Sequence, residues 1–268
     1  MLKKRLIAVL ILRDGQVVQS VRFKHTNVIH YDAVHAMEAF NKWAVDEIVI
    51  LNVSRDAATR EKFTEIVERI SSHCFVPLAA GGWIDNEEYA QKLLRSGADK
   101  LVVNTAVADN PALVSRLAQR YGRQCIVASM DVKRNASGTP QIVVDRGTRV
   151  IDSEPESWAR NAVGLGAGEI FFNSVDHDGA RKGYDLESIR KICATVPVPV
   201  IAFGGVFTWN HLVEGISVGA SAVAAANLFH YTEQSTRKAK TFLAEAGVEV
   251  RQQGRSLAPL PTSHAEKI

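Results

Sequence analysis

The sequence predicts a single (βα)8 barrel built from two half-barrel repeats. The first observation is that the second half of the chain repeats the first at a constant offset of 122 residues (169 − 47, 204 − 82 and 219 − 97). The second is an alternation of short apolar runs with amphipathic stretches. The third is the length, because 268 residues suit one barrel of roughly 250 residues. The matching positions of the repeat are Glu47-Ile48 with Glu169-Ile170, Gly82 with Gly204, and Gly97-Ala98 with Gly219-Ala220.

Eight apolar runs have the composition of parallel strands. They are rich in Val, Ile, Leu and Ala, and they are continuous rather than alternating, as expected for strands covered on both faces. We therefore predict strands over residues 6–12, 47–53, 76–80, 100–104, 126–132, 169–174, 198–203 and 222–226.

The stretches between these runs have helical patterning. Asn110 before Pro111 is a typical helix start, and Gly122 follows the last turn of the same stretch as a C-terminal cap does. We predict helices over residues 31–43, 57–73, 87–96, 111–121, 156–165, 186–195, 209–217 and 232–246.

Two segments fall outside this alternation. Residues 133–153 contain a turn-forming stretch, Asn135 to Pro140, followed by a short apolar run. This pattern predicts a small hairpin inserted after the fifth strand, at the rim where barrel loops carry function. Residues 252–268 are polar with scattered Pro and Ser, and we expect a disordered tail outside the chemistry. The barrel is therefore expected to span residues 1–251.

The composition is that of an ordinary globular protein. It is 46% hydrophobic and 23% charged, with a net charge of +3 and mixed signs along the chain. No nucleic-acid footprint is present, and a mild basic excess suits anionic metabolites. Cys74, Cys125 and Cys193 are widely spaced beside apolar runs, so we expect buried free thiols. The pattern points to no metal and no cofactor.

The apolar run near the N-terminus bears on location. It covers only residues 6–12 before Arg13-Asp14 end it. That is too short for the apolar region of a signal peptide with its cleavage site, and far too short to span a bilayer. We expect a cytoplasmic protein with no membrane partner.

Two glycine pairs at the repeat offset suggest phosphate binding. They follow the third and seventh strands, and glycine lets backbone amides approach an anion without obstruction from a Cβ. The next strand after each pair ends in polar residues that can add donors. The alternative is that each pair only forms a tight turn. The predicted cradles consist of Gly81, Gly82, Asn104 and Thr105, and of Gly204, Gly205 and Asn227.

Two carboxylates are candidates for catalysis. Asp131 ends the fifth apolar run and is expected to face the barrel mouth, where a carboxylate can act as a general acid or base. Its alternative role is to orient a rim cation such as Lys133. Asp176 and Asp178 follow the sixth strand, and of these we favour Asp178. An Asp-x-Asp-Gly turn can also simply cap backbone amides.

Four charges mark the opposite end of the barrel. Each lies at the first residue of a predicted strand or just before it. Turned inward, two cations and two anions would form a polar plug able to open for a small neutral molecule, and they would need mutual pairing to offset desolvation. The alternative is that strand starts are charged because they emerge from solvent. The four residues are Arg5, Glu47, Lys100 and Glu169.

A series of motifs runs in order along the chain: Met1-Leu2-x-Lys4-Arg5-Leu6-Ile7, Asp14-Gly15-x-Val17-Val18, Gly97-Ala98-Asp99-Lys100, Asn104-Thr105, Gln124-Cys125-Ile126-Val127-Ala128, Asp178-Gly179-x-x-x-Gly183-Tyr184-Asp185 and Phe229-His230. With these motifs the chain resembles the cyclase subunit (HisF) of imidazole glycerol phosphate synthase, from about residue 1 to residue 251.

The resemblance implies a (βα)8 barrel that partners a HisH-like glutaminase subunit. Ammonia from the glutaminase enters the barrel bottom and passes through its centre. At the top it meets a substrate with two phosphates, in a reaction that also closes an imidazole ring. Asp99 matches a position that docks the glutaminase. The family's gate of four charges falls on Arg5, Glu47, Lys100 and Glu169.

The catalytic positions of the family are only partly kept. The family uses one aspartate on strand five, which matches Asp131, and one on strand one, which is Ile11 here. The family's loop lysine falls on Gln19, and its strand-two aspartate falls on Asn52. An isoleucine cannot transfer a proton, so loss of one member of an acid–base pair costs roughly 10²–10⁴-fold in rate.

The phosphate loops also depart from the family. Phe203 stands where the family tends to have Ser, and Trp83 stands where a third Gly is usual. The chain therefore resembles a paralogue that keeps the base of the barrel and has a changed top. Such paralogues accompany bacterial surface-polysaccharide genes, where they resemble suppliers of ammonia to a third protein that builds an acetamidino sugar.

Three alternatives remain at this point. The chain can be an active cyclase that uses Asp131 with another group, such as Asp178, in a histidine pathway. It can be a structural partner that neither conducts ammonia nor catalyses. It can be the related isomerase barrel of the same pathway, although that barrel also expects an aspartate at Ile11.

Overall fold

The computed structural model describes residues 3–42, 45–229 and 235–251. Parallel strands close into an eight-stranded barrel, because β12 pairs with β1 and β10 pairs with β7. The predicted (βα)8 fold is confirmed. Around the ring the strands are β1 (Arg5–Arg13), β4 (Glu47–Asn52), β5 (Leu78–Gly81), β6 (Lys100–Val103), β7 (Ile126–Arg134), β10 (Glu169–Ser174), β11 (Val200–Phe203) and β12 (Ala222–Ala225).

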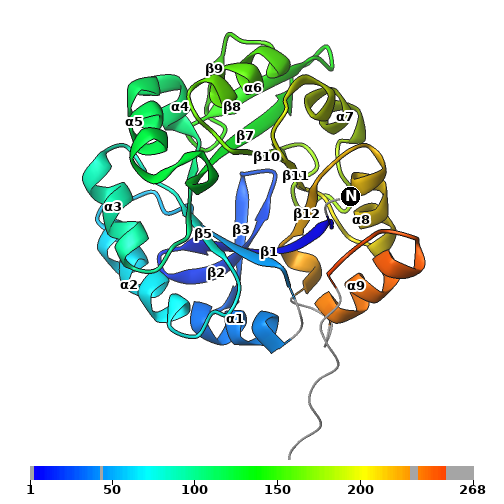
Figure 1. The fold of residues 1–268 in the computed structure, drawn as a ribbon, viewed down its shortest axis with the longest axis horizontal. Coiled ribbons are helices and arrows are strands. Elements are labelled where there is room, and N and C mark those ends of the chain that lie inside the picture. Colours follow the sequence, from blue (N-terminus) through cyan, green and yellow to red (C-terminus); the bar gives the residue numbers. More distant parts are fainter. Residues whose placement is uncertain (1–2, 43–44, 230–234, 252–268) are drawn as a thin grey trace, which may run out of the picture.

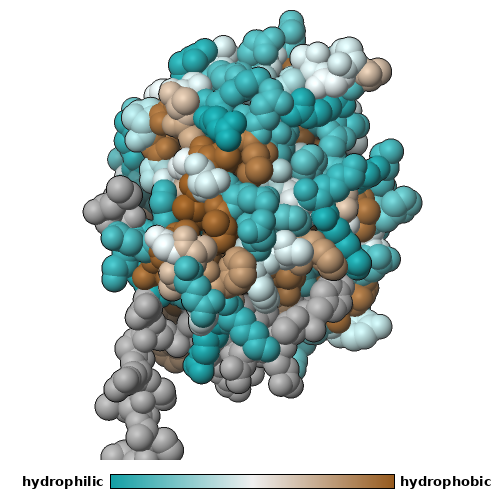
Figure 2. All heavy atoms as spheres, turned by 90° about the vertical axis from the view of Figure 1, so that its right-hand side faces the viewer, coloured by the Kyte–Doolittle hydropathy of each residue, from teal (hydrophilic) through white to brown (hydrophobic). Residues whose placement is uncertain are grey.

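Helices surround the barrel (Figure 1). On the face that carries α7 to α9, hydrophilic side chains lie among hydrophobic ones (Figure 2). The predicted helices ending at residue 43 and starting at residue 232 extend into positions outside the described residues. The helices are α1 (Ala33–Lys42), α2 (Thr59–Ser71), α3 (Glu87–Arg95), α4 (Thr105–Asp109), α5 (Pro111–Tyr121), α6 (Pro155–Gly164), α7 (Leu186–Thr195), α8 (Trp209–Ser217) and α9 (Ser235–Glu245), with 3-10 turns at Arg123–Cys125 and Asn227–Phe229.

Two antiparallel hairpins extend the first strand of each half-barrel. One consists of β8 (Pro140–Val144) and β9 (Arg149–Ile151), continues β7, and was predicted over residues 133–153. The other consists of β2 (Gln16–Val21) and β3 (His25–His30), continues β1, and was not predicted. Its signal was Asp14-Gly15, which turns the chain with positive φ angles of 53° and 84° between two apolar runs. In Figure 1, β2 and β3 lie within the ring of helices, across the barrel.

Residues along each barrel strand alternate between two apolar layers. Ile7, Val9 and Ile11 of β1 belong to a cluster inside the barrel, whereas Leu6, Ala8 and Leu10 belong to the larger core under the helices. Because every second residue faces inward, the side chains inside the barrel follow one order from the starts of the strands to their ends. Charged side chains lie at the strand starts, apolar side chains such as Val49 and Phe171 lie in the middle, and polar side chains follow at the strand ends.

Candidate functional site

The four charged residues at the bottom of the barrel form a closed ring of ion pairs. Arg5 contacts Glu47 at 2.6 Å and Glu169 at 2.8 Å. Lys100 contacts the same two carboxylates, at 3.0 Å and 2.9 Å. The signs therefore alternate around the ring, and each charge has two opposite neighbours.

The two carboxylates of the ring are buried, whereas the side chains of Arg5 and Lys100 are 22% and 15% exposed. Glu47 is only 1% exposed. Burial alone would raise the pKa of Glu169, but the hydrogen bonds and positive charges of Arg5 and Lys100 outweigh it and lower that pKa. Burial likewise opposes ionisation of Arg5, but Glu169 and Glu47 raise its pKa. Mutual pairing thus stabilises four charges that would otherwise be costly to desolvate.

Asp99 lies on the same face of the barrel, directly before Lys100. Its side chain is exposed overall, and Oδ2 accepts a hydrogen bond of 2.8 Å from the backbone N–H of Leu78. This bond fixes the carboxylate beside the start of β5. Its expected role in docking a partner stays a prediction.

Asp131 lies at the opposite, C-terminal end of the barrel strands. Its carboxylate accepts hydrogen bonds from the side-chain amides of Asn104, at 3.1 Å, and Asn173, at 3.0 Å. Burial raises its pKa to about 7, and the charge of Asp178 adds to the shift although the two amides oppose it. A carboxyl group with this pKa can both accept and donate a proton near neutral pH.

Asn173 was missed in the sequence, although a signal for it exists. Counting in two-residue steps along β10 from Glu169 through the inward-facing Phe171 leads to Asn173. Its amide therefore faces the same interior as Asp131. Asn173 lies beside Asp131 on the neighbouring strand and, with Asn104, supplies the two amides that contact its carboxylate.

Asp178 holds the hairpin β2–β3 against the barrel mouth. Its Oδ2 accepts from the hydroxyl of Ser20 at 2.5 Å and from the N–H of Phe23 at 3.4 Å, and its backbone oxygen accepts from the N–H of Arg22. Burial raises the pKa of Asp178 despite these bonds. Asp176, by contrast, accepts from the backbone N–H of Arg134. Ser20 carries no local sequence signal for this role.

The three altered positions also lie at this end of the barrel. Ile11 is 6% exposed and belongs to the apolar cluster inside the barrel. Asn52 accepts a hydrogen bond from the N–H of Ser54, which shapes the loop after β4. Gln19 lines a cavity at the mouth. No described side chain supplies a carboxylate at the Ile11 position.

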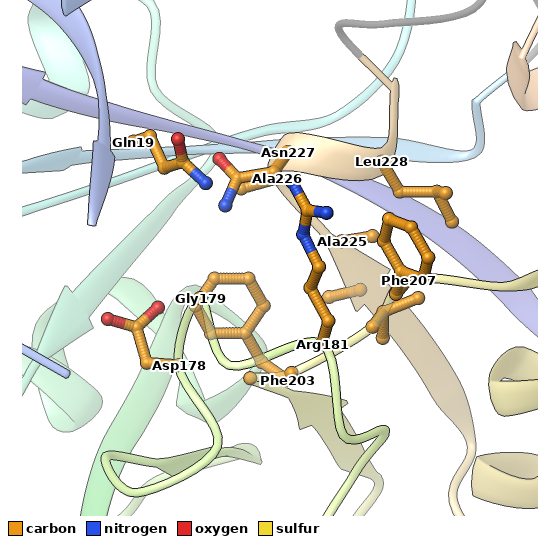
Figure 3. A pocket seen from close by; sticks show the side chains of 14 residues that line it. Gln19, Asp178, Gly179, Arg181, Phe203, Phe207, Ala225, Ala226, Asn227 and Leu228 are labelled. Atoms are coloured by element: carbon orange, nitrogen blue, oxygen red, sulfur yellow. The ribbon is translucent and has the colours of Figure 1, made fainter. Parts of the chain in front are cut away.

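The second predicted cradle borders an open cavity. The cavity has a volume of about 250 Å³ and is lined by Gly204, Gly205, Asn227 and Asp178 among others (Figure 3). Both glycines have left-handed φ angles, of 93° and 97°. Phe203 also lines the cavity, and its ring packs against Phe171 at 5.0 Å between centroids.

The first predicted cradle is occupied by contacts within the chain. The side-chain amide of Asn104 donates both to Ser129 O and to Asp131. The hydroxyl of Thr105 accepts from the N–H of Asp145 in the β8–β9 turn. Gly82 has a φ of 109° and packs against the carbonyl of Asn52, and Gly81 packs against Val102.

The other chemistry-bearing groups of the described residues are the remaining His, Cys, Asp and Glu side chains. In the described ranges, no cluster of three His, Cys, Asp or Glu side chains is placed to hold a metal ion. Cys74, Cys125 and Cys193 are free and half-buried, and burial raises the pKa of Cys193 to about 11. Within the same residues, no helix has the length and apolar character needed to cross a membrane.

The fold and the site together define a class of protein. A barrel made of two repeats, with a cavity, glycine loops and buried carboxyl groups at the C-terminal ends of its strands, has the organisation of a (βα)8-barrel enzyme. The model of the histidine biosynthesis protein family matches residues 5–235, and the chain belongs to this family.

Proposed function

We propose that this chain is the barrel subunit of a glutamine amidotransferase complex. It takes ammonia from a glutaminase partner at the ring of Arg5, Glu47, Lys100 and Glu169 and passes it through the barrel. It does so without full imidazole glycerol phosphate cyclase activity. The observation that carries the proposal is the combination of an intact ring at the bottom with Ile11 in place of a carboxylate at the top.

The interior of the barrel supports the passage of a neutral molecule. Above the ring lie the apolar side chains of the inner cluster, including Val49, Val102 and Val127. Such surroundings penalise a bare ammonium ion far more than neutral ammonia. The ring itself is closed, so ammonia enters only when one ion pair, such as Lys100 with Glu169, separates.

The top of the barrel supports the loss of cyclase turnover. Asp131 has no second carboxylate opposite it on β1, because Ile11 occupies that position. Loss of one member of an acid–base pair lowers the rate by roughly 10²–10⁴-fold. The ammonia would then serve a third protein. From the resemblance to paralogues found with surface-polysaccharide genes, we propose amination in sugar or O-antigen biosynthesis as its use.

The test is a turnover assay with the ribulosyl diphosphate substrate of the cyclase and ammonium salts. We expect a rate about 10²-fold or more below that of a family member with both aspartates, assayed in parallel. A comparable rate that falls on Asp131→Asn would contradict the proposal. Asp176→Asn is the matched control, since this rim carboxylate caps a backbone amide and does not face Asp131.

The second candidate function is an active cyclase of histidine biosynthesis. The observation that favours it is the pKa of Asp131, which burial raises to about 7 so that this one group can act as acid and as base. Asp178 is near enough for its charge to affect Asp131 and lines the cavity. In this case both Asp131→Asn and Asp178→Asn abolish turnover in the same assay.

A further inference from the structure

The two glycine loops at the C-terminal ends of the barrel strands differ, because only the loop after β11 borders the cavity. The cavity of about 250 Å³ is lined by residues of the loop after β11 and of the chain after β12. Of the described residues that line it, none belongs to the loop after β5 or to the Asn104-Thr105 pair. The cause of this difference lies in Trp83 and in the turn of the β8–β9 hairpin.

Trp83 occupies the space next to the first cradle. Its φ of 61° is in the left-handed region that favours glycine, so the backbone of this loop keeps a glycine-type shape around a large side chain. The indole N–H donates to Ser54 O at 3.0 Å. The guanidinium groups of Arg60 and Arg146 lie over the ring, at 5.5 Å and 5.8 Å from its centroid. These contacts offset the backbone strain and fix the ring in place.

The turn of the β8–β9 hairpin covers the same cradle from the other side. Arg146 belongs to this turn, and its neighbour Asp145 donates its backbone N–H to the hydroxyl of Thr105 at 3.1 Å. Arg149 anchors the hairpin to α4 through Asp109 at 2.6 Å. The turn therefore contacts both Trp83, through Arg146, and the hydroxyl of Thr105, through Asp145.

The second cradle has the opposite character. Arg181 lines its cavity, and its guanidinium lies 4.7 Å from the ring centroid of Phe207. In the view of Figure 3 its side chain extends over the cavity from the loop after β10. Arg181 and the two left-handed glycines, Gly204 and Gly205, thus border one open space.

One negative charge also borders this cavity. The carboxylate of Asp178 is 4% exposed as a residue and is directed to the hairpin β2–β3, where Ser20 and Phe23 donate to it. Of the described residues that line the cavity, Arg181 is the one cation. Phe203, Phe207 and Leu228 add apolar surface for an organic body.

We infer that this chain binds an organic ligand with a single phosphate group, held in the second cradle by Arg181, because its own Trp83 and the β8–β9 turn close the first cradle. The inference goes beyond the proposed function and does not depend on ammonia passage; it takes the two glycine loops as phosphate loops, as the sequence predicts. It adds a binding residue, Arg181, and narrows the substrate class from two phosphates to one.

Equilibrium dialysis with radiolabelled inorganic phosphate tests this inference. The wild-type chain is expected to bind one phosphate, and ribose 5-phosphate is expected to displace it. Arg181→Ala should weaken binding by about tenfold or more, since a charge-assisted hydrogen bond is lost. Arg190→Ala is the matched control, because this exposed arginine on α7 lies outside the cavity lining.

Several results would overturn the inference. They are two phosphates on the wild-type chain, no phosphate at all, unchanged binding in Arg181→Ala, or no displacement by ribose 5-phosphate. The assay contains neither glutaminase nor ammonia acceptor. Its failure is therefore distinguishable from failure of the ammonia proposal, which is measured by transfer of nitrogen from glutamine.

Discussion

Ile11 and Asp131 occupy the same position in the two halves of the barrel. Ile11 follows Ile7 and Val9 on the inner face of β1, and Asp131 follows Val127 in the same two-residue steps on β7. The two strands are four places apart around the closed ring, so they lie on opposite sides of it. One half of the repeat thus supplies a carboxyl group at the mouth, and the other supplies an apolar side chain.

The buried carboxyl group of Asp131 makes stability depend on pH. Its pKa is about 7 in the folded chain against an ordinary value of 3.8, so between these values the folded state binds more protons than the unfolded state. The free energy of unfolding therefore falls as pH rises from 4 to 7, by about 4 kcal/mol in total from this group. Urea denaturation at pH 5 and pH 8 measures the part of this change above pH 5, about 3 kcal/mol.

Asp131→Asn isolates this contribution, because the amide stays neutral at both pH values. We expect the variant to lose less stability than the wild type between pH 5 and pH 8, while contributions from Asp178 and Glu169 remain in both proteins. Equal losses in the two proteins would show that Asp131 is ionised throughout.

The ring of ion pairs makes Lys100 important for stability. Lys100→Met leaves the buried carboxylates of Glu47 and Glu169 with Arg5 alone. Removal of one partner from a buried ion pair costs roughly 3 kcal/mol in the free energy of unfolding. Chemical denaturation gives the value. Lys92→Met, which breaks an exposed pair with Glu61, should cost about 0.5 kcal/mol or less, and equal effects of the two substitutions would argue against a buried ring.

The contact between Ser20 and Asp178 should hold the hairpin β2–β3 in place. Ser20→Ala removes the 2.5 Å hydrogen bond to a buried carboxylate, which costs about 1–3 kcal/mol. Hydrogen exchange should then accelerate in residues 16–30 more than in the barrel strands. Ser217→Ala, whose hydroxyl bonds within an exposed helix end, serves as control. Uniform exchange across the chain would contradict a local anchor.

Several strand boundaries follow from the sequence once proline is considered. The strands predicted to start at residues 76 and 198 begin at Leu78 and Val200, each directly after a proline. Pro77 and Pro199 have no N–H to donate to a neighbouring strand, but their carbonyls accept from Ile48 and Ile170. Apolar runs locate buried strands, whereas hydrogen bonding sets their ends.

The candidate site is less evident in the sequence than the barrel that carries it. Glu47 and Glu169 can be placed together because they start equivalent strands and share an inward direction. Ser20 and Arg181, however, act through neighbours far away in the chain, Asp178 in one case and Phe207 in the other. Such pairings depend on how loops cross the barrel mouth, and no local pattern encodes them.

Transfer of nitrogen from glutamine tests the central claim most directly. The complex of this chain with its glutaminase and acceptor enzyme would receive [amide-¹⁵N]glutamine in excess unlabelled ammonium. The account predicts product that carries undiluted ¹⁵N with the wild-type chain, and product diluted by bulk ammonium with Lys100→Met, whose ring is broken. Product from the wild-type chain that carries the isotope ratio of the bulk ammonium would contradict passage through the barrel.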